Sequence, residues 1–416
     1  MKKLVLSAAV AFLATASAMA QDNRDYSAQV GNDNIATTTQ AGDSNENYLL
    51  QWGNENKSTV SQTGEGNVSG AIQFGNENIG MTTQEGNENT SAILQTGDSN
   101  EATVDQWGAN NISNLSQDGI GNEATITQAR RGVSPSSSNS NTSNATQSGT
   151  NNELIVSQYG VGNHNAETSQ SGDDNFARVR QGGNGHDALI TQSGDDNKIY
   201  SQQSGSLNQL TIGQVGNDNF STEYTNGSGN IVSITQTGDD NRSEGYRMGN
   251  SNRTTLTQTF DNNKADVDQI GDLNQVTITQ YGNINDAKVL QEGDSNQAFT
   301  HQANGDSNIS NITQIGDHNY AYTSQYGAGE NQAYVMQDGD RNYGVFNQDG
   351  DSNMGIAWQS GERNQTALTQ NGSDNSSMNL QAGIYNRATI NQTGADNFHV
   401  GAQFGNDNTL TVTQSN

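Results

Sequence analysis

The 416-residue sequence contains no cysteine and only one proline. Without cysteine the chain has neither disulfide bonds nor thiolate nucleophiles, and metal sites built on cysteine are excluded. Disordered chains usually carry more proline and lack strict periodicity, so the single proline favours an ordered fold. Only 30% of the residues are hydrophobic, which is too few for ordinary globular domains with large cores.

Basic residues are also scarce. The chain has 17 Lys and Arg against 45 Asp and Glu, which gives a formal net charge of −28. Nucleic-acid binding requires clustered basic residues, so no nucleic-acid partner is expected. No segment approaches the roughly 20 consecutive apolar residues of a membrane helix, so no membrane insertion is expected.

The first residues have the features of a secretory signal peptide. Lys2 and Lys3 precede an apolar stretch at 4–13, and Ala18-Met19-Ala20 provides a small-residue cleavage site. The sequence therefore predicts a signal peptide at 1–20 and a secreted, extracellular protein. A short N-terminal segment at 21–28 is expected before the first repeat.

A short repeat accounts for the rest of the chain. Gln recurs at every eleventh position in two blocks, 29–128 and 147–416, with three single-residue insertions in the second block. The consensus is Q-x-G-x-x-N-x-s-x-h-x-Q, where s is small and h is usually aliphatic. Between the blocks, 129–146 contains the only proline, Pro135, and is expected to form a loop or hinge that ends in a degenerate repeat with Asn141 in phase.

The spacing within one unit predicts a β-strand followed by a turn. Asn100, Ala102, Val104 and Gln106 occupy alternate positions, so in a strand they share one face, and the residues between them are polar. The Gly and the Asn of the consensus favour a tight turn. The predicted fold is an all-β, amyloid-like β-solenoid of stacked two-strand coils with two facing parallel sheets. Each coil consists of two consecutive repeat units, so that positions i and i+22 stack.

The inward amides should hydrogen-bond from coil to coil, because the two aliphatic side chains of a coil cannot offset the entropy of ordering its two repeat units. These ladders would also let a further molecule add to a terminal coil, and the last unit, 403–414, keeps the full repeat where a capping unit would be atypical. The residues chosen to represent the self-assembly ladder are Gln40, Asn45, Gln51, Asn56, Gln62, Asn67, Gln106, Asn122, Gln128, Gln280, Asn408 and Gln414.

Three irregularities converge on one place in this pattern. Thr225 and Arg247 are the only residues other than Gln in the Gln phase, and they are one coil apart. Glu223 lies on the same inward face, and Gly245 stands where an aliphatic residue is usual. Two alternatives remain open: a buried Glu223–Arg247 ion pair, or a frayed unit that exposes both charges. In either case Glu223, Thr225 and Arg247 form a possible brake on assembly.

The sequence predicts no catalytic residue, no cofactor and no metal site. The five His residues at 164, 186, 301, 318 and 399 are interpreted as distant from one another in the repeat, and His186 as the one exception in the Asn phase. Gly-Asp-Asp-Asn turns at 172–175, 194–197 and 238–241 are interpreted as turn chemistry rather than calcium sites, because the nonapeptide spacing of calcium-binding repeats is absent.

The repeated unit resembles the curlin repeat of bacterial curli subunits from Gln29 to Gln414. The resemblance implies a fimbrial, biofilm-forming fibre protein that pairs with itself, starts growth on a nucleator subunit and leaves the cell through a dedicated outer-membrane secretion pore. Contacts with host or abiotic surfaces would follow. Whether the chain is the main subunit or a nucleator stays open, as does the alternative of a monomeric solenoid adhesin.

Overall fold

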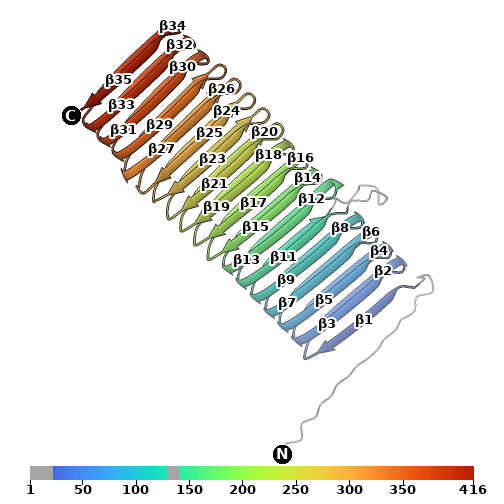
Figure 1. Cartoon of the computed structure of the whole chain (residues 1–416). Coiled ribbons are helices and arrows are strands. Elements are labelled where there is room, and N and C mark those ends of the chain that lie inside the picture. Colours follow the sequence, from blue (N-terminus) through green and yellow to red (C-terminus); the bar gives the residue numbers. More distant parts are fainter. Residues whose placement is uncertain (1–21, 129–139) are drawn as a thin grey trace, which may run out of the picture. The chain divides into compact units, whose positions relative to one another are not determined.

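A computed structural model of the chain describes residues 22–128 and 140–416, which form two compact units, Met1–Asp196 and Asn197–Asn416. The predicted signal peptide at 1–20 and most of the predicted loop at 129–146 lie outside the described residues. Every regular element in the described part is a β-strand (Figure 1). The all-β prediction is therefore confirmed.

The strands of the first unit follow one another with short turns. They are β1 (Arg24–Val30), β2 (Ile35–Asp43), β3 (Glu46–Asn54), β4 (Lys57–Glu65), β5 (Val68–Asn76), β6 (Ile79–Asn87), β7 (Thr90–Asp98), β8 (Glu101–Ala109), β9 (Ile112–Ile120), β10 (Glu123–Gln128), β11 (Thr142–Thr150), β12 (Glu153–Gly162), β13 (Asn165–Asp173), β14 (Phe176–Asn184) and β15 (Asp187–Ser193).

The second unit continues the same pattern. Its strands are β16 (Lys198–Ser206), β17 (Gln209–Val215), β18 (Phe220–Ser228), β19 (Ile231–Thr237), β20 (Arg242–Met248), β21 (Arg253–Thr259), β22 (Lys264–Ile270), β23 (Gln275–Tyr281), β24 (Asp286–Glu292), β25 (Gln297–Ala303), β26 (Ile309–Ile315), β27 (Tyr320–Gly329), β28 (Gln332–Asp338), β29 (Tyr343–Asp351), β30 (Met354–Glu362), β31 (Gln365–Ser373), β32 (Ser376–Ile384), β33 (Arg387–Ala395), β34 (Phe398–Asn406) and β35 (Thr409–Ser415).

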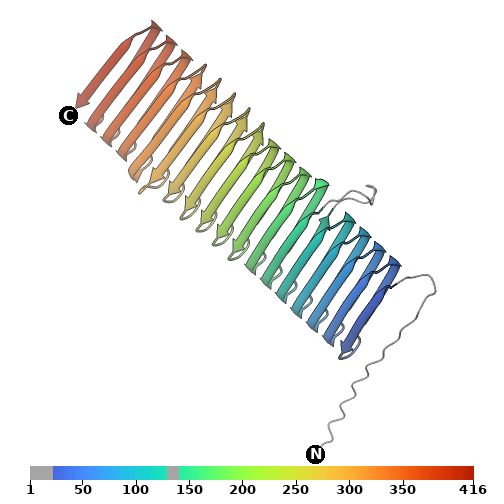
Figure 2. The ribbon, with the colours of Figure 1, turned by 45° about the vertical axis from the view of Figure 1, so that its right-hand side comes forward.

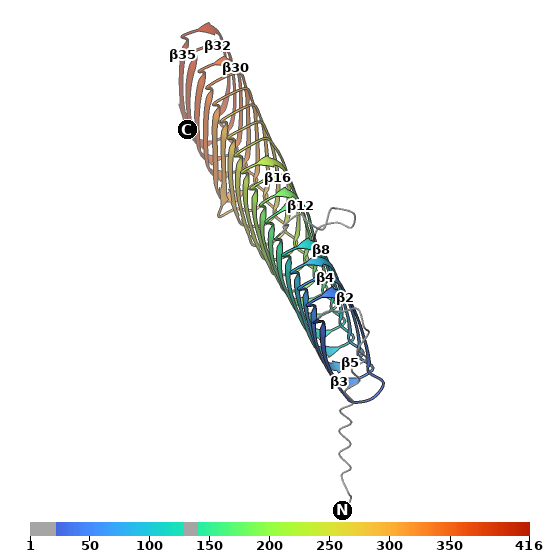
Figure 3. The ribbon, with the colours of Figure 1, turned by 90° about the vertical axis from the view of Figure 1, so that its right-hand side faces the viewer.

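Within each unit, odd-numbered strands pair with odd-numbered strands and even-numbered with even-numbered, always in parallel. In the first unit β3 pairs with β5 and β4 pairs with β6, and in the second β19 pairs with β21 and β20 pairs with β22. Each unit is thus two facing parallel sheets wound from a single chain (Figures 2 and 3). The predicted two-strand coil is confirmed.

The inward face has the predicted composition. Asn100, Ala102, Val104 and Gln106 are all fully buried, whereas Glu101 between them is exposed. The single-residue insertions lie at or beyond the ends of strands: two appear as register shifts in the last residues of β12 and β27, and Gln302 still bonds to Gln325 across a spacing of 23 residues. An insertion in a strand would have turned every later side chain to the other face.

Most turns in the described residues use two residues with positive φ. The consensus Gly is one, as expected, because a Cβ on Gly97 would lie 2.0 Å from the carbonyl oxygen of Gly119 in the next coil. The residue before the Asn is the other, such as Ser99 with φ of 58°. Left-handed geometry is uncommon for residues other than Gly, and the periodicity alone does not predict it.

The first strand starts earlier than the expected boundary. β1 pairs in full register with β3, and the side chain of Asn23 accepts hydrogen bonds from the backbone and side-chain nitrogens of Asn45. Because Asn23 and Gln29 already complete one strand unit, most of the segment assigned to 21–28 belongs to the solenoid.

The pairing also continues past the interruption at 129–146. β11 pairs with both β9 and β13, and β10 pairs with both β8 and β12. The described end of this segment contains Asn141, whose backbone N–H donates to the Oδ1 of Asn111, so it is in phase as expected.

Candidate functional site: the buried amide ladders

The Gln side chains form a hydrogen-bonded column inside each sheet. The Nε2 of Gln51 donates to the Oε1 of Gln73 at 2.8 Å and to the carbonyl oxygen of Ile35 at 3.1 Å. The first bond links coils of one sheet, and the second reaches the strand of the facing sheet. Both amide hydrogens are thereby used, which satisfies a group that would be costly to bury alone.

The Asn side chains form a second column at the turns. The backbone nitrogen and Nδ2 of Asn67 both donate to the Oδ1 of Asn45, at 3.2 and 2.9 Å, and Nδ2 also donates to the carbonyl oxygen of Gly86 at 2.7 Å. The Asn amide therefore holds the turns of three successive coils. The bonds from one Asn side chain to the next run toward lower residue numbers, whereas the bonds from one Gln side chain to the next run toward higher residue numbers.

All twelve residues chosen from the sequence lie in these columns. Nine of them are fully buried, namely Asn45, Gln51, Asn56, Gln62, Asn67, Gln106, Asn122, Gln128 and Gln280. Gln40, Asn408 and Gln414 are only half-buried, because their strands have a bonded neighbour on one side within the described residues.

The Gln column is interrupted where the sequence predicts. Thr225 pairs with Arg247, and Glu223 pairs with Gly245, across β18 and β20. The Nη1 of Arg247 donates to Glu223, and both side chains are almost completely shielded from solvent. The predicted buried ion pair is confirmed and the frayed alternative is wrong.

Gly245 provides the space for this ion pair. A Cβ at Gly245 would lie 2.2 Å from the Oε2 of Glu223 and 2.7 Å from the Nη2 of Arg247. The missing aliphatic side chain is therefore not an isolated irregularity. It is the volume into which the carboxylate and guanidinium fit.

Arg247 also reconnects the interrupted column through the facing sheet. Its Nε donates to the Oγ1 of Thr254 at 2.9 Å, and that hydroxyl donates to the Oε1 of Gln269 at 2.9 Å. The Nη2 of Arg247 is buried without a hydrogen-bond partner. Burial raises the pKa of the Glu223 carboxyl, and Arg247 beside it acts in the opposite direction. Most polar atoms of the cluster are therefore hydrogen-bonded, but the Nη2 of Arg247 is not.

Two histidines replace asparagines in the Asn column, in adjacent coils of the first unit. His164 and His186 are buried, and their rings stack at 5.1 Å between centroids with planes 12° apart. The sequence interpretation of widely separated histidines is wrong for this pair, and His164 is a second exception to the Asn phase. Asn163 and Asn165 flank His164 beside a one-residue insertion, but the consensus counted back from Gln170 through Ala166 already places His164 at the Asn position.

The imidazole of His164 reproduces the bonds of an Asn amide. Its Nδ1 accepts the backbone N–H of His186 at 3.2 Å, as an Asn Oδ1 would, and its Nε2 lies 3.2 Å from the carbonyl oxygen of Tyr159. Both contacts are satisfied only when the neutral ring carries its hydrogen on Nε2. Burial, followed by the neighbouring His186, lowers the pKa of His164 to about 4.

Neither a metal centre nor a membrane-spanning helix occurs in the part of the chain that the structure describes. No group of three or more His, Asp or Glu side chains there could hold a metal ion. No helix within residues 22–128 and 140–416 is long and apolar enough to cross a membrane.

The stacked coils and buried amide columns define a structural β-solenoid repeat protein. Nine segments, which together cover more than half of the sequence, match the curlin associated repeat family, and the chain therefore belongs to that family. The matched residues are 31–64, 75–108, 97–129, 163–194, 172–205, 249–282, 283–316, 361–394 and 386–415. None of the curated proteins compared with the sequence matches it.

Proposed function

We propose that the protein is a secreted structural subunit that assembles with copies of itself into an extracellular, curli-type amyloid fibre for surface adhesion and biofilm matrix. The observation that carries the proposal is the buried amide columns, in which most Gln and Asn side chains bond to the same residue type one coil away. Ile390 and Gln392 in β33 are fully buried, whereas Val412 and Gln414 at the same positions of β35 are half-buried. An added coil would bury Val412 and Gln414.

The direction of the hydrogen bonds makes such a fibre polar. The Gln-to-Gln bonds donate toward higher residue numbers, and the Asn-to-Asn bonds donate toward lower residue numbers. Two molecules that met head to head would place donor against donor in one column and acceptor against acceptor in the other. Head-to-tail addition is the arrangement that continues both columns, on a nucleator subunit as well as on a growing end.

The experiment that tests the proposal is incubation of the purified chain without residues 1–20. We expect fibres by electron microscopy, thioflavin fluorescence, and a diffraction spacing of ~4.8 Å along the fibre. A chain that stays monomeric and thioflavin-negative at high concentration would instead support a monomeric adhesin on the cell surface.

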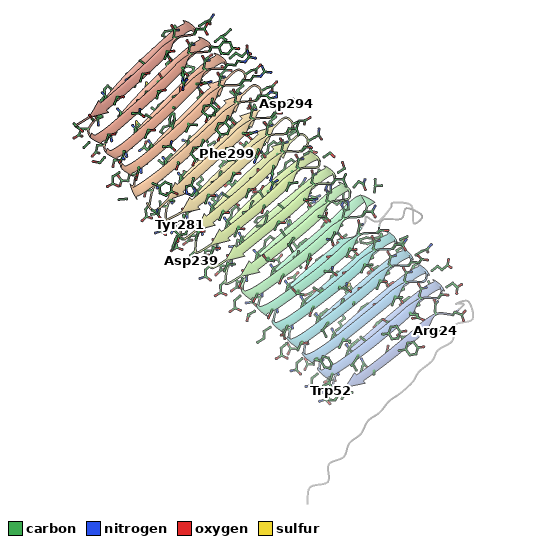
Figure 4. All side chains as sticks on the ribbon, viewed as in Figure 1. Arg24, Trp52, Asp239, Tyr281, Asp294 and Phe299 are labelled. Carbon is green, nitrogen blue, oxygen red and sulfur yellow. The ribbon has the colours of Figure 1, made fainter. Side chains whose placement is uncertain are left out.

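Stacked carboxylates at the turns should slow assembly at low salt. Asp272, Asp294, Asp317 and Asp340 follow one another along one edge of the second unit, each of the last three bonded through Oδ1 to the backbone of the previous coil (Asp294 in Figure 4). The Debye length falls from ~30 Å at 0.01 M to ~8 Å at 0.15 M salt. We expect salt to shorten the lag several-fold, because it screens the repulsion between like charges.

The lag is measured by thioflavin fluorescence at pH 7.5 in NaCl between these concentrations. Asp294→Asn with Asp317→Asn keeps the side-chain acceptors but removes two charges. This variant should start from a shorter lag at low salt and respond less to NaCl. Equal lag times for both proteins at every salt concentration would contradict the charge effect.

A further inference from the structure

One sheet surface of the second unit carries a cluster of large uncharged side chains. On β28, β30 and β32 the central outward positions carry six side chains without charge: Tyr334, Met336, Ile356, Trp358, Met378 and Leu380. We call these six residues the apolar face. Met336, Trp358 and Met378 are 43%, 50% and 45% exposed, so large hydrophobic side chains meet solvent here.

The apolar face borders a more charged part of the sheet. At the six equivalent positions of β20, β22 and β24, four side chains are charged and two, Tyr246 and Leu290, are not. The charged ones are Glu244, Asp266, Asp268 and Lys288, and Lys288 forms an ion pair with Asp266. β26 lies between the two regions and has the neutral Asn311 there. An exposed apolar patch beside a charged belt is typical of an interaction surface rather than of scattered surface residues.

The face is built from two parallel columns with a groove between them. Tyr334, Ile356 and Met378 are directly paired along one column, and Met336, Trp358 and Leu380 along the other. At β26 to β30 the groove has a volume of about 640 Å³, and its lining is almost entirely apolar. Trp358 lies on the middle strand of the three.

We propose that the apolar face binds the same face of a second copy, so that two solenoids associate side by side. The net charge of −28 opposes contact between two copies over most of their surface, and this uncharged face is where two copies can meet with the least repulsion. Asp338 and Glu362 lie at the ends of β28 and β30, so an anionic membrane surface would be repelled at the margins.

Geometry supports the same partner. Both copies present columns with one side chain per coil, so their spacings match along the whole contact. A two-fold rotation places a column of one copy in the groove of the other, which is the dry interdigitation of paired sheets in amyloid. Trp358 at the centre would be the anchor, as is usual for residues that dominate binding.

The test uses the full chain without residues 1–20, with Trp358→Thr and Met336→Thr combined. Both side chains point outward, so the columns of buried amides are untouched. Leu189→Thr with Tyr200→Thr is the matched control, because these side chains are 40% and 36% exposed at outward positions of β15 and β16, and their strand partners Glu167 and Thr222 are polar. Sedimentation of the soluble chain and fibre width by electron microscopy are measured for all three proteins.

We expect the parent and the control to pair laterally, and the Trp358 variant to show a dimer dissociation constant at least about tenfold higher and single, narrow filaments. In a Trp52→Phe, Trp107→Phe background, the emission of Trp358 should shift to shorter wavelength as dimers form. Unchanged pairing of the variant, or a monomeric parent whose Trp358 is shielded only by phosphatidylcholine vesicles, would overturn the proposal. Pairing of the soluble chain does not require fibre growth, so failure of the proposed function would leave this test intact.

Discussion

Replacing Arg247 by Gln should destabilise the coils around β20 by about 3–5 kcal/mol, because it leaves the Glu223 carboxylate buried without its partner. Arg242→Gln on the same strand is the matched control. Arg242 pairs with Glu244, but the two side chains are 51% and 40% exposed, so this change should cost less than about 1 kcal/mol.

Replacement of the whole cluster should instead increase the stability of these coils. Thr225→Gln and Arg247→Gln restore the Gln column, and Glu223→Val removes the buried carboxylate. Buried ion pairs exchanged for well-packed residues often leave a protein more stable by about 1–4 kcal/mol. This triple variant should therefore resist denaturant better than the parent, and it should assemble faster if the cluster is a brake on assembly.

Hydrogen exchange across β18, β20 and β22 measures these effects, because a solenoid loses stability locally and not as one unit. Thioflavin kinetics measure the brake. Equal protection in the Arg247 and Arg242 variants would contradict the energetic role of the ion pair. A triple variant with parental kinetics would show that the cluster is structural and does not regulate assembly.

Acid should loosen the first unit at His164 and His186. A proton on the Nδ1 of His164 would face the N–H that it now accepts, and the second ring lies 5.1 Å away. The pKa of His164 is about 4 in the folded chain against about 6.5 when unfolded. The stability from the neutral ring is thus complete above pH 6.5 and decreases as the pH falls toward 4, by up to about 3 kcal/mol.

The other groups that face this pair do not reverse the direction. Burial lowers the pKa of His186, and Asp187 beside it opposes that effect only partly. Tyr159 contacts His164 through its carbonyl oxygen, and the guanidinium of Arg180 lies 5.5 Å from the ring of Tyr159.

The variant His164→Asn with His186→Asn restores amides in the column. Hydrogen exchange of peptides that contain the turns at 160–164 and 182–186, between pH 7.5 and 4.5 and corrected for intrinsic rates, should show acid loosening in the parent and none in this variant. His318→Asn, in an exposed turn, is the control and should behave like the parent. Acid loosening that persists without the two histidines would place its origin elsewhere.

The fold could be predicted because the repeat determines both the length of each strand unit and which face of the strand points inward. A two-residue alternation bounded by Gly and Asn leaves one face inward, and Asn100, Ala102, Val104 and Gln106 occupy it as expected. The ion pair could also be predicted, because positions one coil apart stack directly. The pairing of Thr225 with Arg247 leaves Glu223 one step away on the same face. These inferences need only the register between stacked coils, and the 11-residue repeat defines that register along the whole solenoid.

Features that depend on local geometry could not be read from the sequence. The consensus counted back from Gln170 places His164 in the Asn phase, but the bond from His186 to its Nδ1 and the stacking of the two rings appear only in the structure. The role of Gly245 becomes clear only when the side chains of Glu223 and Arg247 are placed in three dimensions. The apolar face was missed for another reason: its residues are outward positions, which the consensus leaves unspecified.

The interruption between β10 and β11 has a practical consequence. Gln117 bonds to Gln147 although the two lie 30 positions apart in the sequence, and yet the strands on both sides keep full register with their neighbours. Extra sequence at a turn edge therefore leaves the stacked backbone undisturbed. Peptides or enzymes could therefore be grafted at this position without redesign of the scaffold. In an assembled fibre with coils ~4.8 Å apart, each molecule would carry one graft, so the grafts would be regularly spaced.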